Sequence, residues 1–225
     1  MKKTIYLMVV LCLSLFRLDA RSSEVLVEVP TPIGELFLYR PSSEEMQKMS
    51  PVAKKIFVEA FSTTYREYHL KSGSSDSIEK WLRLRGEVTL EGWLSAVFDD
   101  EYQEYLAGTK EFIFFSNAHG DLVGWLSYSP MSAQGELYLS QCSLEAGSRN
   151  KKVATSAFAQ VLQKDYAKVI FPGAKVLKVI TRKINAITKH LFTRAGFIMD
   201  ETIDPAIYGE SYDDRYVGYR LILEP

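Results

Sequence analysis

The sequence predicts an α/β (α+β) domain built on a mixed, mostly antiparallel sheet with helices on both faces. Runs of β-forming residues alternate with amphipathic helical stretches along the chain, in an order that suits one sheet covered on two sides. The chain has 225 residues, of which 47% are hydrophobic and 12% aromatic, so it can bury a sizeable core and is not expected to be disordered. We expect about six or seven strands.

The start of the chain has the composition of a secretory signal peptide. Lys2 and Lys3 precede an apolar run that is too short to span a membrane, and Ala20 offers a small residue for cleavage. We therefore expect a signal peptide at 1–20, a single exported domain at 21–225, periplasmic or secreted, and no stable membrane insertion after cleavage. An uncleaved hydrophobic N-terminus is the alternative.

Charge and cysteine content narrow the function classes of the mature domain. Cleavage would remove three basic and one acidic side chain, leaving 24 basic and 27 acidic groups and a net charge of −3. This balance argues against general nucleic-acid binding. Cys142 would be the one cysteine left, so no intramolecular disulfide can form. We expect Cys142 to be a small buried core residue in preference to a reactive thiol.

The N-terminal part of the domain reads as one strand and a long helix. Residues 35–40 alternate as a strand, and Ser50 followed by Pro51 predicts a helix start, with a hydroxyl cap and a proline at the first helical position. Apolar residues at helical spacing continue to about Tyr68, and 71–75 is a flexible break.

Two further helices and a hairpin are expected next. Asp76 starts a short helix, and a longer one at about 90–106 ends at Gly108. The expected core face of the longer helix is Trp93, Leu94, Val97 and Tyr105. Residues 112–115 and 122–128 suit a hairpin. His119 lies in its turn and has no partner at ligand spacing, so no metal site is expected.

The stretch from Gly135 to Phe197 carries most of the functional signal. A strand at 136–144 is followed by a break at 145–148, a basic loop, and a helix with one apolar stripe. The stripe consists of Ala154, Ala157, Phe158, Val161 and Leu162. The orphan N–H groups and positive dipole end of a helix that follows a basic loop can hold a pyrophosphate. A solvated basic turn is the alternative.

A second strand and helix follow at 174–180 and 185–197, the helix ending on Gly196. Arg149-x-x-Lys152-x-Ala154 resembles the (Gln/Arg)-x-x-Gly-x-(Gly/Ala) acyl-CoA loop of the GCN5-related N-acetyltransferases (GNAT superfamily), and Asn185 with the later Arg-Ala-Gly-Phe resembles the next helix of that family. The resemblance covers roughly 112–223.

The resemblance implies an acyl-CoA N-acyltransferase fold whose strands at 137–144 and 175–180 are splayed neighbours. It also implies acetyl-CoA as cosubstrate, without a metal, and transfer of an acetyl group to a primary amine of a small molecule or protein. The implied cofactor-binding residues are Ser143, Leu144, Arg149, Asn150, Lys151, Lys152, Val153, Ala154 and Asn185. Ser143 and Leu144 would contact the pantetheine, and the 149–154 loop the pyrophosphate.

Glu136 is the candidate general base, since some members of the family place a glutamate near the start of this strand. A surface carboxylate at the strand end is the alternative reading, and His190 and Tyr138 are further candidates. Two positions depart from the family pattern. Lys152 replaces the middle glycine of the loop, and Phe192 occupies the usual position of a proton-donating tyrosine. An exported, catalytically inactive GNAT-like binding or interaction module is therefore the alternative function. The last strand is expected at 216–223, after an acidic and aromatic loop.

Overall fold

The computed structural model describes residues 24–71, 86, 89–131, 133–148, 153, 157, 160–183, 185–203 and 216–223. Its strands are β1 (Glu24–Thr31), β2 (Gly34–Arg40), β3 (Glu111–Ser116), β4 (Leu122–Pro130), β5 (Glu136–Leu144), β6 (Val176–Arg182), β7 (Ile198–Met199) and β8 (Tyr216–Ile222). Its helices are α2 (Ser43–Lys71), α4 (Leu90–Leu106), α6 (Lys164–Ile170) and α7 (Ala186–Arg194), with a 3₁₀ turn η1 (Ala146–Ser148). The predicted signal peptide at 1–20, the short helix after Asp76 and the loop before β8 lie outside the described residues.

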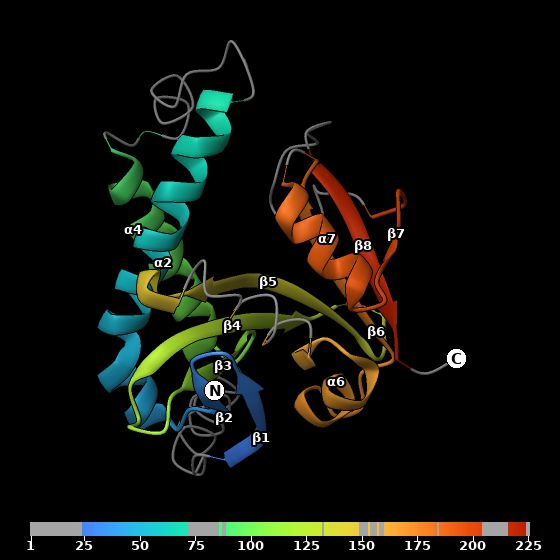
Figure 1. Cartoon of the computed structure of the whole chain (residues 1–225), viewed down its shortest axis with the longest axis horizontal. Helices are drawn as coiled ribbons and strands as arrows, with labels where there is room; N and C mark the ends of the chain where they lie inside the picture. Colours follow the sequence, from blue (N-terminus) through green and yellow to red (C-terminus); the bar gives the residue numbers. More distant parts are fainter. Residues whose placement is uncertain are drawn as a thin grey trace, which may run out of the picture.

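All eight described strands form one sheet in the order β1-β2-β3-β4-β5-β6-β8-β7 (Figure 1). Every pairing between neighbours is antiparallel except that of β5 with β6, which is parallel. The mixed, mostly antiparallel sheet is thus confirmed. The structure has more strands than the expected six or seven because the sequence reading missed β1 and the two-residue edge strand β7.

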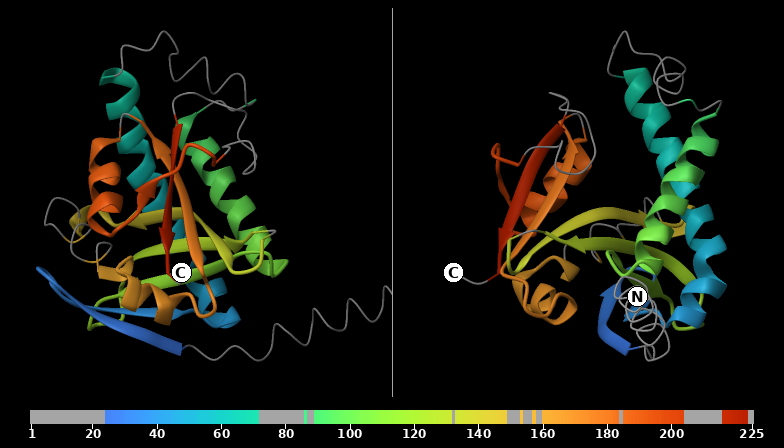
Figure 2. Two further views of the ribbon diagram at one scale, coloured as in Figure 1. Left: turned by 90° about the vertical axis from the view of Figure 1, so that its right-hand side faces the viewer. Right: turned by 180° about the vertical axis from the view of Figure 1, so that it is seen from behind.

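Helices cover both faces of the sheet, and each face has its own core. On one face α2 and α4 lie side by side (Figure 2) and bury an aromatic cluster around Phe57, Phe98 and Trp125. Trp125 Nε1 donates a buried hydrogen bond of 2.9 Å to the Ala53 carbonyl, which fixes α2 against β4. The other core contains residues of α6, Phe192 of α7 and the helical residues 153, 157 and 161.

Helix α2 begins at Ser43, so the predicted start at Ser50 and Pro51 is wrong. The actual cap is a reciprocal pair in which the Glu45 amide donates to Ser42 Oγ and the Ser42 amide donates to the Glu45 carboxylate, at 3.2 and 2.9 Å. This capping box satisfies two of the N–H groups that a helix start leaves unpaired.

Pro51 lies inside α2, where it has no N–H to offer the carbonyl one turn earlier. Ser50 Oγ donates a hydrogen bond of 3.2 Å to that carbonyl, of Gln47. The serine expected to cap a helix therefore compensates for a proline within one.

The other helix boundaries agree better with the sequence. Helix α4 spans Leu90–Leu106, as expected, with Thr89 as its cap and a left-handed Gly108 after it. Helix α6 was not expected. The preceding helical turn stops because Gln163 has extended backbone angles, and α6 starts at the next residue. Among the described residues, we find no helix with both the length and the apolar character needed to cross a membrane.

Candidate functional site

The central feature of the sheet is the divergence of β5 from β6. The two strands pair over only three residues, Glu136–Tyr138 with Val176–Lys178. Beyond Tyr138, β5 continues beside β4 and turns away from β6, while β6 continues beside β8 (Figure 1). The splayed neighbours that the family resemblance implied are therefore present. One edge of the β5 backbone, over 139–144, has no strand beside it in the described part of the chain.

Local sequence features set where the divergence starts. Gly135, just before β5, has a φ of +82° and accepts hydrogen bonds from the amides of Lys175 and Val176 at 2.7 and 3.2 Å. A Cβ at this glycine would lie 2.9 Å from Lys175 Cγ, so a larger residue would have to displace the Lys175 side chain and would be strained at this φ. Further along, Ser140 is an extra residue in the β4–β5 register, because Ser127 pairs with Gln141 and Tyr128 with Leu139.

Ser143 and Leu144, the predicted pantetheine contacts, lie on the part of β5 that no longer pairs with β6, and their side chains are buried. Leu144 is buried in the core that contains the helical residues 153, 157 and 161. Ser143 is 2% exposed, and its Oγ has no hydrogen-bond partner among the described residues. Any contact of these two residues with a cosubstrate would therefore come from their backbone.

The predicted pyrophosphate loop is anchored on both sides. Before it, the Glu145 amide donates to the Val123 carbonyl at 2.8 Å, and Ser148 Oγ donates to the Glu145 carboxylate at 2.8 Å. After it, Val153 is helical and fully buried. Between these points the loop residues Arg149, Asn150, Lys151 and Lys152, and Ala154 in the helix, lie outside the described residues.

Asn185 and Phe192 belong to α7 and its cap. Asn185 Oδ1 accepts a hydrogen bond of 3.0 Å from the Thr188 amide, so this side chain caps the helix. Phe192 is buried against Phe197 and Tyr219, with ring centroids 5.2 and 5.7 Å away. The position that carries a tyrosine in many relatives is thus occupied here by a core side chain without a proton to donate.

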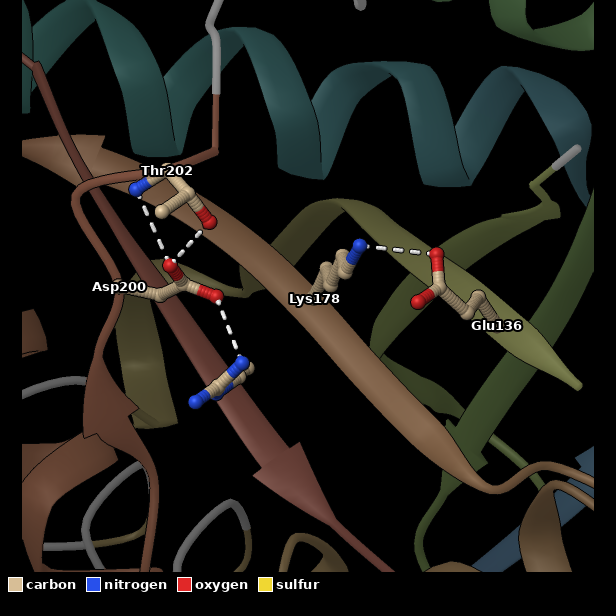
Figure 3. A network of polar contacts seen from close by, with 5 residues as sticks. Glu136, Lys178, Asp200 and Thr202 are labelled. Atoms are coloured by element: carbon tan, nitrogen blue, oxygen red, sulfur yellow. Dashed lines mark hydrogen bonds and ion pairs between the residues drawn. The ribbon is translucent and has the colours of Figure 1, made fainter. Parts of the chain in front are cut away.

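Glu136 takes part in a line of charged side chains that crosses β5, β6 and β8 (Figure 3). Its carboxylate accepts a 2.8 Å hydrogen bond from Lys178 Nζ, and both side chains are about four-fifths buried, with exposed fractions of 23% and 21%. Asp200, which follows β7, lies 3.5 Å from Arg220 and accepts hydrogen bonds from the amide and hydroxyl of Thr202, at 3.0 and 2.6 Å.

These partners favour the ionised form of Asp200. Desolvation of its nearly buried carboxylate acts to raise its pKa, but the hydrogen bonds from Thr202 and the positive charges of Arg220 and Lys178 outweigh that effect and lower the pKa. Asp200 is therefore a fixed negative charge near neutral pH.

Arg182 connects the far end of β6 to α2. Its guanidinium carbon lies 4.8 Å from the ring centroid of Tyr65 on α2 and 5.4 Å from that of Tyr216 on β8. Cation–π contacts of this kind attract the cation to the ring, more strongly when they are partly shielded from water. The two contacts of Arg182 link α2 to β6 and β8, the strands on the far side of the divergence from β5.

Of the other candidates, Tyr138 shares a strand and a face with Glu136, whereas His190 and His119 are exposed. Cys142 is also exposed, so its assignment as a buried core residue is wrong. Its strand lacks a neighbour on the β6 side at this point, which explains why a residue in the middle of the sheet is not covered. In the described residues, His, Cys, Asp and Glu nowhere form a group of three that could hold a metal ion.

Sequence reading missed Lys178, Asp200, Arg182 and Arg220. The alternation of Lys178 and Arg182 with buried residues in one strand was a visible sign that both lie on the same face. Their partners depend on the register between strands far apart in the chain, and that register cannot be read from local pattern.

Residues 76–197 match the acetyltransferase (GNAT) family, and they make up more than half of the chain. The chain therefore belongs to the GNAT family of acetyltransferases. No curated protein sequence matches it.

Solved structures show the same fold at low identity. A putative GNAT acetyltransferase from Desulfovibrio desulfuricans aligns with a TM-score of 0.52 and 16% identity, over 84% of this chain and 99% of that one. RimJ of Mycobacterium smegmatis, in complex with CoA-disulfide, aligns at 0.53 and 12%, over 88% and 87%. The PaiA N-acetyltransferase of Thermoplasma acidophilum, in complex with coenzyme A, aligns at 0.51 and 12%, over 83% and 98%.

Proposed function

We propose that this protein transfers an acetyl group from acetyl-CoA to a primary amine of a small molecule or protein. The observation that carries the proposal is the divergence of β5 from β6 after three paired residues. In the described part of the chain, no strand flanks 139–144 on the β6 side, and the predicted pyrophosphate loop follows in sequence after the turn that ends β5. Family membership and the neighbours solved with coenzyme A or CoA-disulfide support acetyl-CoA as the donor.

Two parts of acetyl-CoA would contact two successive segments of the chain, the β5 backbone and the loop that follows it. The amide-rich pantetheine would pair with the β5 backbone near Ser143 and Leu144, on the side away from β4, and the side chains of both residues are buried. The pyrophosphate would lie against 149–154, where Arg149, Asn150, Lys151, Lys152 and the N–H groups of Val153 and Ala154 follow a turn anchored by Glu145.

Glu136 would act as the general base for the incoming ammonium. One ammonium proton passes to its carboxylate, directly or through water, and the nitrogen lone pair forms the bond to the thioester carbon. The carbon–sulfur bond then breaks, and the nitrogen gives up its second proton to solvent. Backbone N–H groups of β5 would polarise the carbonyl. Because Phe192 is a buried hydrocarbon side chain, the leaving thiolate would take its proton from solvent.

Calorimetric titration of acetyl-CoA into residues 21–225 tests the proposal. We expect wild type to bind, and Arg149→Ala to weaken binding by about tenfold, or about 1.4 kcal/mol. Lys152→Gly should tighten binding by roughly tenfold if the Cβ of Lys152 obstructs the pyrophosphate, and change little if its ammonium turns outward. Lys168→Ala, at an exposed position on α6, is the matched control. No binding by wild type and Lys152→Gly would favour the inactive binding module.

We further propose that residues 1–20 are removed on export to the periplasm or the medium. The basic start, short apolar run and Ala20 support this. N-terminal sequencing of the protein from its natural source checks it, and an intact Met1 in the soluble cytosol would contradict it. An exported acetyltransferase must meet acetyl-CoA elsewhere, for example after delivery to another cell.

A further inference from the structure

The two faces of the diverging half of the sheet carry different side chains. Leu177, Val179 and Tyr219 share a core with Val153 and other residues of the helix that follows the predicted pyrophosphate loop. That helix therefore lies on this face. Strand side chains alternate, so Glu136, Lys178 and Arg220 lie on the opposite face.

The cations of this opposite face are arranged in a way that costs energy unless each is neutralised. Lys178 and Arg220 are direct register partners on antiparallel strands, and like charges in that position repel. Each has its own carboxylate: Lys178 Nζ is 2.8 Å from Glu136, and Arg220 is 3.5 Å from Asp200. The four groups together carry no net charge.

Catalysis disturbs that balance. Lys178 Nζ contacts one oxygen of the Glu136 carboxylate, Oε2, so an ammonium that gives its proton to Glu136 through the other oxygen or through water adds a third cation to this group. Among the described residues of this group, the carboxylates of Glu136 and Asp200 then face three cations. An acceptor with one positive charge leaves an excess of one charge among these partly buried groups, and a polyamine leaves more. An acceptor that also carries one negative charge keeps the group neutral.

We propose that the preferred acceptor is a primary amine with a carboxylate or another anionic group a few bonds away, its ammonium on Glu136 and its anion on Lys178 and Arg220. The proposal rests on the acetyltransferase function proposed above. The lower exposure of Lys178, 21% against 45% for Arg220, places the stronger contact with the anion at the lysine, because partly buried charge pairs are less screened by water.

Three acceptors of equal chain length isolate the effect of the anion. The compounds 3-aminopropanoate, propylamine and 1,3-diaminopropane carry the same primary amine and end in a carboxylate, a methyl group and an ammonium. Release of coenzyme A from acetyl-CoA gives kcat/KM for each. We expect the carboxylate compound to exceed propylamine by about tenfold or more, the size of one charge-assisted contact, and the diamine to be the poorest.

Variants at Arg220 test whether the preference for an anionic acceptor arises from this face of the sheet. Arg220→Gln should lower the ratio of kcat/KM between 3-aminopropanoate and propylamine several-fold, while Arg220→Lys, which keeps the charge, should retain most of it. Lys168→Gln, an exposed lysine on α6, should leave the ratio at the wild-type value.

The outcomes separate this inference from the proposed function. Equal kcat/KM for the three acceptors, or a ratio unaffected by Arg220→Gln, overturns the acceptor class while acetyl transfer stands. Binding of acetyl-CoA with turnover of none of the three also rejects this class. Failure of wild type to bind acetyl-CoA in calorimetry removes the proposed function, and this inference with it.

Discussion

Gly124 of β4 packs closely against the part of β5 that no longer pairs with β6. It is the register partner of Leu144, and a Cβ added at this glycine would overlap both the Ser143 carbonyl oxygen and the Leu144 side chain. Phe115 Cδ2 would be a third close neighbour, at 3.2 Å. Gly124→Ala should therefore push β5 away from β4 at the residues proposed to hold the pantetheine.

The size of the effect follows from the atoms that would have to move. A backbone carbonyl cannot swing aside as a flexible side chain can, so we expect overpacking to cost about 2 kcal/mol. For a domain of this length, that lowers the melting temperature by about 4–8 °C. Displacement of β5 should also weaken acetyl-CoA binding, because contacts made by a strand's backbone depend on its position.

Thermal unfolding and calorimetry with acetyl-CoA measure the two effects. Gly147→Ala is the matched control, since the nearest atom to its Cβ would be Glu145 Oε1, at 3.8 Å, an ordinary contact. We expect the control to unfold at the wild-type temperature. A Gly124→Ala protein with the wild-type melting temperature and the wild-type affinity for acetyl-CoA would refute the argument that β4 positions residues 139–144 of β5.

Two further predictions concern charged groups. Lys110 Nζ is 2.6 Å from the Glu101 carboxylate, and both side chains are nearly buried. Lys110→Met should therefore lower the free energy of unfolding, measured in urea, by about 3–5 kcal/mol, and adding Glu101→Leu should restore much of that stability. An unchanged free energy of unfolding for Lys110→Met would contradict this. The pKa of Asp200 is lowered in the fold, so its contribution to stability is present above its ordinary value of 3.8 and lost as the pH falls through the lower folded value. Unfolding free energies measured between about pH 5 and about pH 3 should fall less steeply for Asp200→Asn than for wild type, and equal slopes would remove the assigned role of Thr202 and Arg220.

The parts of the fold that sequence predicted well are those with a strong local signal. Helix α4 has a threonine cap, a helical apolar pattern and a glycine after it, and its predicted bounds are confirmed. Strand β5 was predicted with its observed bounds because β-forming residues there are followed by a clear break. The predicted start of α2 is wrong because Ser50 and Pro51 are a stronger local helix-start signal than the capping box that the helix uses.

Features that depend on contacts between distant segments were not predictable in the same way. Strand β7 has two residues and exists because it pairs with β8, not because of its own sequence. The exposure of Cys142 follows from the divergence of β5 and β6, which no local pattern encodes. The family resemblance supplied that divergence as an expectation, and only the register shows that it begins after Tyr138.

The position of the divergence also bears on the role of Glu136. This residue opens β5 in the stretch where β5 and β6 pair, and its carbonyl accepts a hydrogen bond of 2.9 Å from the Met131 amide on the other side. Its backbone is therefore held on both sides, while no described strand flanks 139–144 on the β6 side. A general base has to keep its place when a substrate arrives, whereas the strand edge that binds the cosubstrate has to remain available. The three-residue parallel pairing meets both needs, because it holds the Glu136 carboxylate within 2.8 Å of Lys178 Nζ and ends before 139–144. In the proposed reaction, an acceptor ammonium approaches a carboxylate that already has Lys178 on one oxygen, so it adds its charge to one that the fold already provides. This excess of positive charge is why the charge of the acceptor, more than its shape, is expected to decide which amines this site accepts.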